Sequence, residues 1–199
     1  MKYSGARIKM SPKRLRQQIL PSDADNIYIR IRCDDELIGN VFATRWIHEN
    51  RELLWITQLC VHSDYRNRGI AKMLLRELRG DEYHAVGILS SHPFAVSAVL
   101  RVFGRGVEEV DLSFIKECAR DVMESCPVVY VRDAKLVGGL FTDEMKAMAC
   151  ADTGFWVDHG EPNQALRLIE EKGVRWPLGD LPEGCEFLGL VETIRRSDE

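Results

Sequence analysis

A short basic segment in the first half of the chain has residue types that bind an anion. It reads RNRGIA, from Arg66 to Ala71, and fits the pattern Arg/Gln-x-x-Gly-x-Gly/Ala. Two arginines supply positive charge, and Gly69 has no Cβ, so a ligand can approach the backbone closely. The segment lacks the Gly-Lys-Ser/Thr of a nucleoside-triphosphate loop and the glycine spacing of a dinucleotide fingerprint. These residues therefore predict a phosphate-binding loop of a different kind.

The position of this segment strengthens the prediction. The apolar run Leu53–His62 precedes it, and apolar residues at Ile70, Leu74 and Leu78 follow at helical spacing. The loop thus joins a strand to a helix. The first N–H groups of a helix have no intrahelical partner, and the helix dipole favours negative charge at that end. Such a junction is suited to binding a pyrophosphate.

The segments around the loop predict an α/β (α+β) fold. Ile27–Arg32 alternates apolar and polar residues, and Leu37–Trp46 and Leu53–His62 follow it after short polar turns, so these three segments predict an antiparallel meander. After the loop helix, Ala85–Ser90 is a short apolar strand, and Pro93–Phe103 is a helix that begins with proline. A strand–helix–strand crossover makes its two strands parallel.

The residues beyond Gly106 predict elements that complete the sheet. We predict one domain over residues 1–199, with a core at 27–106 and a C-terminal extension at 107–199. The expected helices outside the core are Pro12–Leu20, Ser113–Met123 and Pro162–Lys172, and the expected strands are Val128–Val131, Leu136–Phe141, Thr153–Asp158 and Glu186–Val191.

The run Gln58–Leu75 resembles the acetyl-CoA-binding core of the GNAT family, the GCN5-related N-acetyltransferases. The family pattern is an apolar strand ending in valine, here Val61, a turn with an aromatic residue, here Tyr65, the loop, and a helix with paired leucines. The order of elements from Ile27 to Gly104 is similar too. The resemblance implies a mixed sheet with splayed central strands, acetyl-CoA as co-substrate without a metal, and an amine as acceptor.

The resemblance also implies which residues hold the coenzyme. The backbone of the third strand would bind the pantetheine arm as an added strand would. The loop would hold the pyrophosphate through backbone amides and the Arg66 side chain. The implied coenzyme-binding residues are Leu59, Cys60, Val61, Arg66, Asn67, Arg68, Gly69, Ile70, Ala71 and Lys72.

The general acid of many GNAT relatives, a tyrosine on the second helix, is missing because Leu100 stands in its place. The reaction still requires that an ammonium lose a proton and that a thiolate be stabilised or protonated. The candidate catalytic residues are Glu52, His92 and Asp158, with His159 beside it, and Tyr130 as a relocated acid.

Each of these candidates has a simpler interpretation. Glu52 reads equally as a solvated turn charge, Asp158 as a turn residue and His92 as a helix cap. Cys60 has no histidine partner pattern, and we interpret it as a core thiol.

Composition narrows the class of protein. The chain has 199 residues, a formal net charge of −4 and six cysteines. This charge argues against nucleic acid as a partner, and no apolar run approaches the length of a membrane helix. Without a signal-like segment or a zinc-type cysteine spacing, we expect a cytoplasmic protein with reduced thiols.

The sequence thus predicts an acetyltransferase that moves the acetyl group of acetyl-CoA to a primary amine of a small molecule. A protein lysine or N-terminal acetyltransferase is the alternative within enzymes. A non-catalytic acyl-CoA-binding module is the alternative outside them, favoured by the missing tyrosine and the short N-terminal region. A homodimer is compatible with the sequence.

Overall fold

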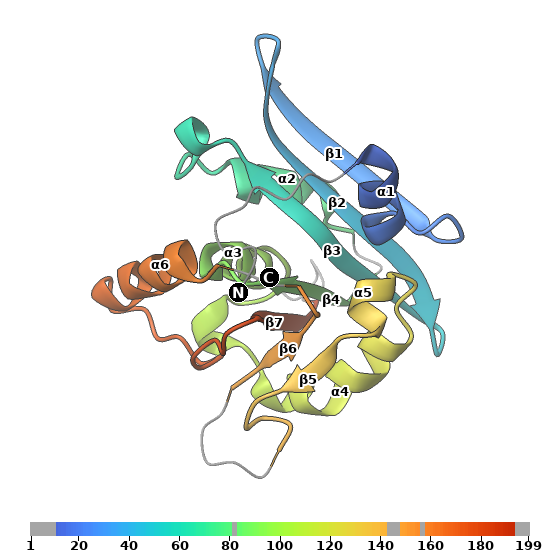
Figure 1. The fold of residues 1–199 in the computed structure, drawn as a ribbon, viewed down its shortest axis with the longest axis vertical. Coiled ribbons are helices and arrows are strands. Elements are labelled where there is room, and N and C mark those ends of the chain that lie inside the picture. Colours follow the sequence, from blue (N-terminus) through green and yellow to red (C-terminus); the bar gives the residue numbers. More distant parts are fainter. Residues whose placement is uncertain (1–10, 81–82, 143–147, 156–157, 194–199) are drawn as a thin grey trace.

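A single mixed sheet of seven strands runs through the described part of the chain, in the order β1-β2-β3-β4-β7-β6-β5 (Figure 1). The computed structural model describes residues 11–80, 83–142, 148–155 and 158–193. The strands are β1 (Asp25–Cys33), β2 (Glu36–His48), β3 (Arg51–Val61), β4 (Tyr83–Ser90), β5 (Lys135–Val137), β6 (Cys150–Asp152) and β7 (Cys185–Glu192). The helices are α1 (Pro12–Ile19), α2 (Ile70–Leu78), α3 (Pro93–Phe103), α4 (Leu112–Glu124), α5 (Val129–Arg132) and α6 (Gly160–Glu171). The predicted mixed α/β fold is confirmed.

The meander β1-β2-β3 forms as the alternating sequence predicts. Both strand pairs are antiparallel. The opposed residues Tyr28 and Phe42 stack their rings 4.4 Å apart between centroids. The turn from β1 to β2 passes through Asp34 with a φ of 50°, a left-handed conformation that aspartate adopts more readily than most residues.

The crossover from β3 through α2 to β4 makes the one parallel pair recorded in the described sheet. Pairing runs from Glu52 opposite Tyr83 to Ile56 opposite Ile88. The sheet is tightly packed here, since a Cβ at Gly87 would lie 2.2 Å from the Trp55 ring. Only glycine at this position leaves room for that buried indole.

The parallel pairing then stops. β3 continues for five more residues, through Val61, and there it pairs with β2 alone. A bulge at Thr57 marks the change, because Phe42 opposes Gln58 while Ala43 opposes Ile56. The two central strands therefore splay apart, as the resemblance implied, and we call the space between their C-terminal ends the β3–β4 gap.

The C-terminal half completes the sheet on the other side of β4. β7 pairs antiparallel with β4, followed by β6 and β5. The predicted helix Ser113–Met123 corresponds to α4, Pro162–Lys172 to α6, and the predicted strand Glu186–Val191 to β7.

The prediction of a strand at Val128–Val131 was wrong, because this segment begins the one-turn helix α5. Val128 and Val131 are both fully buried while Val129 is 48% exposed. A spacing of three between buried residues suits a helix, and an apolar run this short does not distinguish the two structures.

Two other predicted strands were misplaced. β5 ends at Val137 rather than Phe141, and Gly138 follows it with a φ of 110°. β6 ends at Asp152, before the predicted start at Thr153. The Asp152 carboxylate accepts a hydrogen bond of 2.8 Å from the Gly154 N–H, which turns the chain there. Residues 156 and 157 of that prediction lie outside the described residues.

Helices cover both faces of the sheet. A Cβ at Gly39 in β2 would lie 2.8 Å from the Ile70 side chain, so Gly39 faces α2. Trp46 lies an odd number of residues further along β2 and therefore points to the opposite face, where its Nε1 donates to Ser125 Oγ at 3.1 Å. We call these the α2 face, which also carries α3, and the α4 face, which also carries α5.

Candidate functional site

The C-terminal end of β3 offers an open backbone edge. Residues 58–61 pair with β2 on one side, and within the described ranges no strand lies on the other. This edge includes the predicted residues Leu59, Cys60 and Val61. Unpaired N–H and C=O groups along a strand bind an extended chain by adding it as a further strand. The β3–β4 gap therefore suits a linear ligand rich in amides.

The loop after β3 ends at the predicted junction. A single 3₁₀ turn, Ser63–Tyr65, leads into Arg66, and Asn67 and Gly69 then have φ values of 60° and 79°. Gly69 is the N-cap of α2, and its carbonyl accepts the Met73 N–H at 3.0 Å. A Cβ at Gly69 would meet no atom within 4 Å. Glycine is therefore favoured here by backbone conformation, and the space around it is open.

The start of α2 presents backbone donors to that open space. The N–H groups of Ile70, Ala71 and Lys72 come before the first intrahelical bond and have no backbone acceptor in the described chain. Arg68 lies over the Tyr65 ring, 5.3 Å from its centroid, and the Tyr65 hydroxyl donates to Glu36 at 3.4 Å. These contacts hold the loop in a conformation that leaves its amides accessible to an anion.

A carboxylate from α6 already contacts this loop. Arg66 Nη1 donates to Glu161 Oε1 at 2.5 Å, and His92 Nε2 lies 3.6 Å from the same oxygen. The hydrogen bond from Arg66 lowers the pKa of Glu161, and burial lowers the pKa of His92. Glu161 is therefore ionised and His92 mainly neutral at neutral pH. Figure 1 shows α6 beside α3.

His92 lies across the gap from Arg66. It is the N-cap residue of α3, directly after β4, but its side chain makes no capping hydrogen bond. Its ring packs against Phe94, with 5.7 Å between centroids. His92 is thus the cap residue of α3, as the alternative interpretation held, while its ring lies against Phe94 and Glu161. Through Glu161, the loop after β3 and His92 after β4 are thus joined by side-chain contacts.

Tyr130 reaches the inner end of the gap from the α4 face. Its hydroxyl donates to the carbonyl of Thr57, at the bulge, over 3.3 Å. Its ring lies 5.9 Å from that of Phe155 between centroids. Burial, and then the negative charge of Glu186, raise the pKa of Tyr130. Tyr130 therefore keeps its proton at neutral pH and is a hydrogen-bond donor at the point where β3 and β4 separate.

Glu186 is a titratable residue that the sequence reasoning did not consider. It lies in β7, next to Phe187, which pairs with the last residue of β4. Burial raises the pKa of Glu186, and the Thr153 hydroxyl partly offsets this rise. The available signal was an acid near the start of the largely apolar strand CEFLGLVE.

Of the predicted catalytic residues, Glu52 lies at the other end of its strand, and Asp158 lies in the turn before α6. Glu52 is near the start of β3, five residues before Thr57, or about 17 Å at about 3.4 Å per residue. It lies 3.3 Å from Arg45. The exposed Asp158 accepts a hydrogen bond of 2.9 Å from the Gly160 N–H, just before α6.

The interpretation of Cys60 as a core thiol was wrong, because its side chain is exposed. The reason is its position past the last pair with β4, where the sheet no longer has a neighbour on that side.

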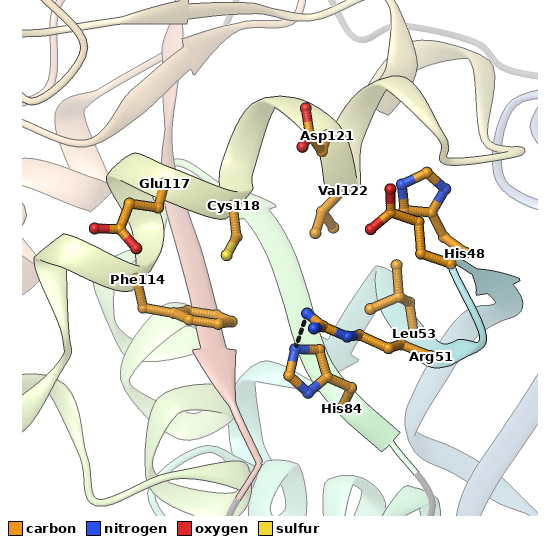
Figure 2. Close-up of a pocket in the computed structure, with 10 residues that line it drawn as sticks. His48, Arg51, Leu53, His84, Phe114, Glu117, Cys118, Asp121 and Val122 are labelled. Atoms are coloured by element: carbon orange, nitrogen blue, oxygen red, sulfur yellow. Dashed lines mark hydrogen bonds between the residues drawn. The ribbon is translucent and has the colours of Figure 1, made fainter.

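A separate pocket of about 80 Å³ lies at the opposite end of the parallel strands, between the β2–β3 turn, β4 and α4 (Figure 2). Arg51 Nη1 lies 3.2 Å from His84 Nε2, close to Cys118 and Phe114 on α4 (Figure 2). Its lining residues begin β3 and β4, whereas the loop follows the end of β3. This pocket is therefore separate from the site described above.

Two kinds of feature are missing from the part of the chain that the structure describes. None of its helices has the length and apolar character to cross a bilayer. No three histidine, cysteine or acidic side chains there come together as a metal would require.

Comparison with known proteins gives one match to a family model. Residues 24–100 match the model described as Acetyltransferase (GNAT) domain, which confirms for this part of the chain the resemblance stated from the sequence. The match extends from the start of β1 into α3 and includes β3, the loop and α2. A search of the curated proteins found no match.

Solved structures give weaker similarities. An aminoglycoside acetyltransferase from an uncultured soil metagenomic sample, in complex with sisomicin, is 14% identical with a TM-score of 0.32, over 38% of this chain and 50% of that one. A second such enzyme, HMB0005, is 20% identical with a TM-score of 0.33, over 41% and 57%. NAA60 of Arabidopsis thaliana is 22% identical with a TM-score of 0.32, over 44% and 72%. The chain thus spans about half the length of the first of these structures, and we draw no substrate from them.

Proposed function

We propose that this protein is an N-acetyltransferase that moves the acetyl group of acetyl-CoA to a primary amine of a small molecule. The observation that carries the proposal is the junction at the end of β3. There, an open strand edge leads directly to a helix N-terminus whose first N–H groups are free and whose cap is a left-handed Gly69. Coenzyme A has the matching order of groups, an amide-containing arm followed by a diphosphate.

The described residues fit this ligand. The edge at Leu59–Val61 would pair with the pantetheine amides, and the N–H groups from Gly69 to Lys72 would hold the diphosphate. Arg66 adds charge at the same place once Glu161 moves away. The thioester would then lie deeper in the gap, near the bulge at Thr57. Acetyl-CoA supplies an activated acyl group with a thiolate leaving group.

The α4 face is the side from which we expect the acceptor to come. The loop and α2 lie on the other face of the sheet, so the coenzyme would fill the gap from there. On the α4 face, Tyr130 and Phe155 flank the gap. Because Tyr130 is protonated, it would donate its proton to the thiolate as the C–S bond breaks. We propose it as the general acid in place of the missing helix tyrosine.

The size of the acceptor follows from what covers this face. Two parts of the C-terminal half, α5 and the residues around Phe155, lie beside the gap on the α4 face. A peptide would need an extended open groove. The covering segments favour a small amine over a protein lysine or a protein N-terminus.

The binding claim is tested by calorimetry with CoA and acetyl-CoA, with ATP and NADH as controls. We expect saturable binding of the two coenzymes alone, and a shift in thermal unfolding, because a ligand at one hundred times its Kd adds about 2.7 kcal/mol to stability. Absence of any heat with CoA and acetyl-CoA would contradict the proposal.

The activity claim is tested by mass spectrometry of a panel of small amines incubated with the protein and acetyl-CoA. Product mass is preferable to a thiol reagent because Cys33 and Cys60 are exposed and would themselves react. Acetylation of at least one amine, dependent on the protein, is expected. Coenzyme binding without product across amines, peptides and lysine side chains would instead support the non-catalytic module.

A further inference from the structure

A group of side chains from three separate segments meets on the α4 face beside the β3–β4 gap. It consists of Tyr130 from α5, Thr153 and Phe155 from the segment after β6, and Glu186 from β7. We propose that Glu186 is the general base of the reaction, accepting the proton of the ammonium substrate while Tyr130 serves the leaving sulfur. This inference rests on the proposed acetyl transfer. It assigns the role of general base to a residue that was not among the candidates from the sequence.

The strand register places Glu186 at the correct end of the sheet. Phe187 pairs with Ser90, the last residue of β4, and Glu186 pairs with Ala151 in β6. Glu186 thus lies just past the C-terminal end of β4, where the gap opens. The loop that follows β3 lies at this same end, since β3 and β4 are parallel.

The alternation of side chains places Glu186 on the correct face. A Cβ at Gly189 would lie 3.0 Å from Val96 in α3, so Gly189 faces the α2 side of the sheet. Glu186 is three residues away in the same strand, and an odd separation directs its side chain to the opposite face. That face carries α5, from which Tyr130 reaches Thr57 at the gap, and the negative charge of Glu186 contributes to raising the pKa of Tyr130.

The surroundings of Glu186 are suited to a carboxylate that accepts a proton from a cationic substrate. The residue is only partly exposed, and within the described ranges no lysine, arginine or histidine lies within ion-pair distance of it. A partly buried carboxylate without a cationic partner is costly, and an ammonium beside it would relieve that cost. Burial raises the pKa of Glu186, which makes it a better proton acceptor than an exposed carboxylate.

The proton transfers balance. Glu186 takes one proton from the ammonium, and the freed lone pair forms the C–N bond to the thioester carbonyl. As the C–S bond breaks, its electron pair stays on sulfur, which takes the Tyr130 proton. The second proton lost from the amine nitrogen restores Tyr130, and Glu186 releases its proton to solvent. The products are the amide, free CoA and one proton.

Three titratable side chains lie near Glu186. They are Tyr130 from α5, Cys185 on the same strand, and His159 before α6, whose Nε2 lies 3.2 Å from the Cys185 carbonyl oxygen. Burial raises the pKa of Tyr130 and of Cys185, so both are neutral at neutral pH. Glu186 must be ionised to act, so the rate of the unchanged protein falls as pH drops through the raised pKa of Glu186.

The test compares Glu186→Gln with Glu192→Gln, the same change at the exposed far end of the same strand. We expect Glu186→Gln to lower kcat by at least about 100-fold, the contribution typical of a general base, with the Kd for acetyl-CoA unchanged. Its residual rate would then follow the free amine, rising roughly tenfold per pH unit up to the pKa of the amine. Glu192→Gln would keep the rate and the pH profile of the unchanged protein.

A folded Glu186→Gln protein that keeps kcat and the low-pH limb of its pH–rate profile would overturn the proposal. If thermal unfolding shows that Glu186→Gln does not fold, Glu186→Asp provides the same test. It keeps the charge but withdraws it by one methylene, so kcat falls while the low-pH limb remains. A failure of the proposed function is distinct, because the unchanged protein would then bind no coenzyme or acetylate no amine.

Discussion

The loop on the α2 face and the side-chain group on the α4 face are built from different parts of the chain. The loop, residues 66–72, is one continuous segment, and its donors are mainly backbone N–H groups. The α4-face group comes from α5, the segment after β6 and β7, and its working atoms are one hydroxyl and one carboxylate.

Under the proposed function, coenzyme binding and proton transfer therefore depend on different parts of the molecule. A site made of backbone amides depends on conformation and on the charge of the ligand, and it tolerates most changes of side chain. A site made of two side chains loses its function when either is replaced. Changes at the loop should therefore alter coenzyme affinity, and changes on the α4 face should alter the rate at constant affinity.

The largest expected effect is that of Gly69→Asp on binding. Asp and Asn are comparably tolerated at a φ of 79°, so the pair Gly69→Asp and Gly69→Asn differs mainly in charge. A carboxylate at the helix N-terminus would repel the diphosphate, and we expect the Kd for CoA to rise at least about 100-fold, near 2.7 kcal/mol. Calorimetry measures this, and Gly69→Asn should stay close to the unchanged protein. Equal Kd values of the two variants for CoA would contradict the proposal that this loop binds the diphosphate.

The next largest expected effect is that of Tyr130→Phe, a change on the α4 face, on the rate. It removes the hydroxyl that donates to Thr57 and would protonate the thiolate. We expect kcat to fall about 100-fold, the lower end for a general acid, with the Kd for acetyl-CoA unchanged. Steady-state kinetics and calorimetry give the two values. Tyr28→Phe, at a 46% exposed position on β1, is the matched control. An unchanged kcat in Tyr130→Phe would contradict the proposal that Tyr130 is the general acid.

Glu161→Gln should have the smallest effect, and in the favourable direction. The Glu161 carboxylate must leave Arg66 before a diphosphate binds there, and an exposed ion pair is worth about 0.2–1 kcal/mol. CoA should therefore bind up to about fivefold more tightly to Glu161→Gln. The gain should shrink as salt screens the pair. Glu170→Gln, exposed on the same helix, should change nothing. Weaker CoA binding in Glu161→Gln would mean that this carboxylate supports the loop.

The region of the loop was also the more predictable from sequence. α3 has the predicted bounds Pro93–Phe103, because proline marks its start and the apolar spacing continues to a glycine. The strand-to-helix junction at Gly69 could be predicted because all its residues are neighbours in the chain and Gly69 has a conformational reason to be glycine.

The α4-face group could not be derived in the same way. Tyr130 was proposed only as a substitute acid, within a segment predicted as a strand that is helix α5. Glu186 and Tyr130 are far apart in the sequence, and their proximity depends on the pairing of β7 with β4 and β6. No local spacing encodes that pairing, since it is decided by the burial of whole strands.

The pairing of β7 with β4 has a consequence for how the protein is made. β4 ends at Ser90, but its second neighbour begins only at Cys185, so the nascent chain must grow by about one hundred further residues before that edge of β4 is covered. Until then, an apolar strand with unpaired backbone groups stays exposed to other chains. The strand β4 is therefore synthesised early, but its edge is covered only when β7, the last strand of the described sheet, has been made.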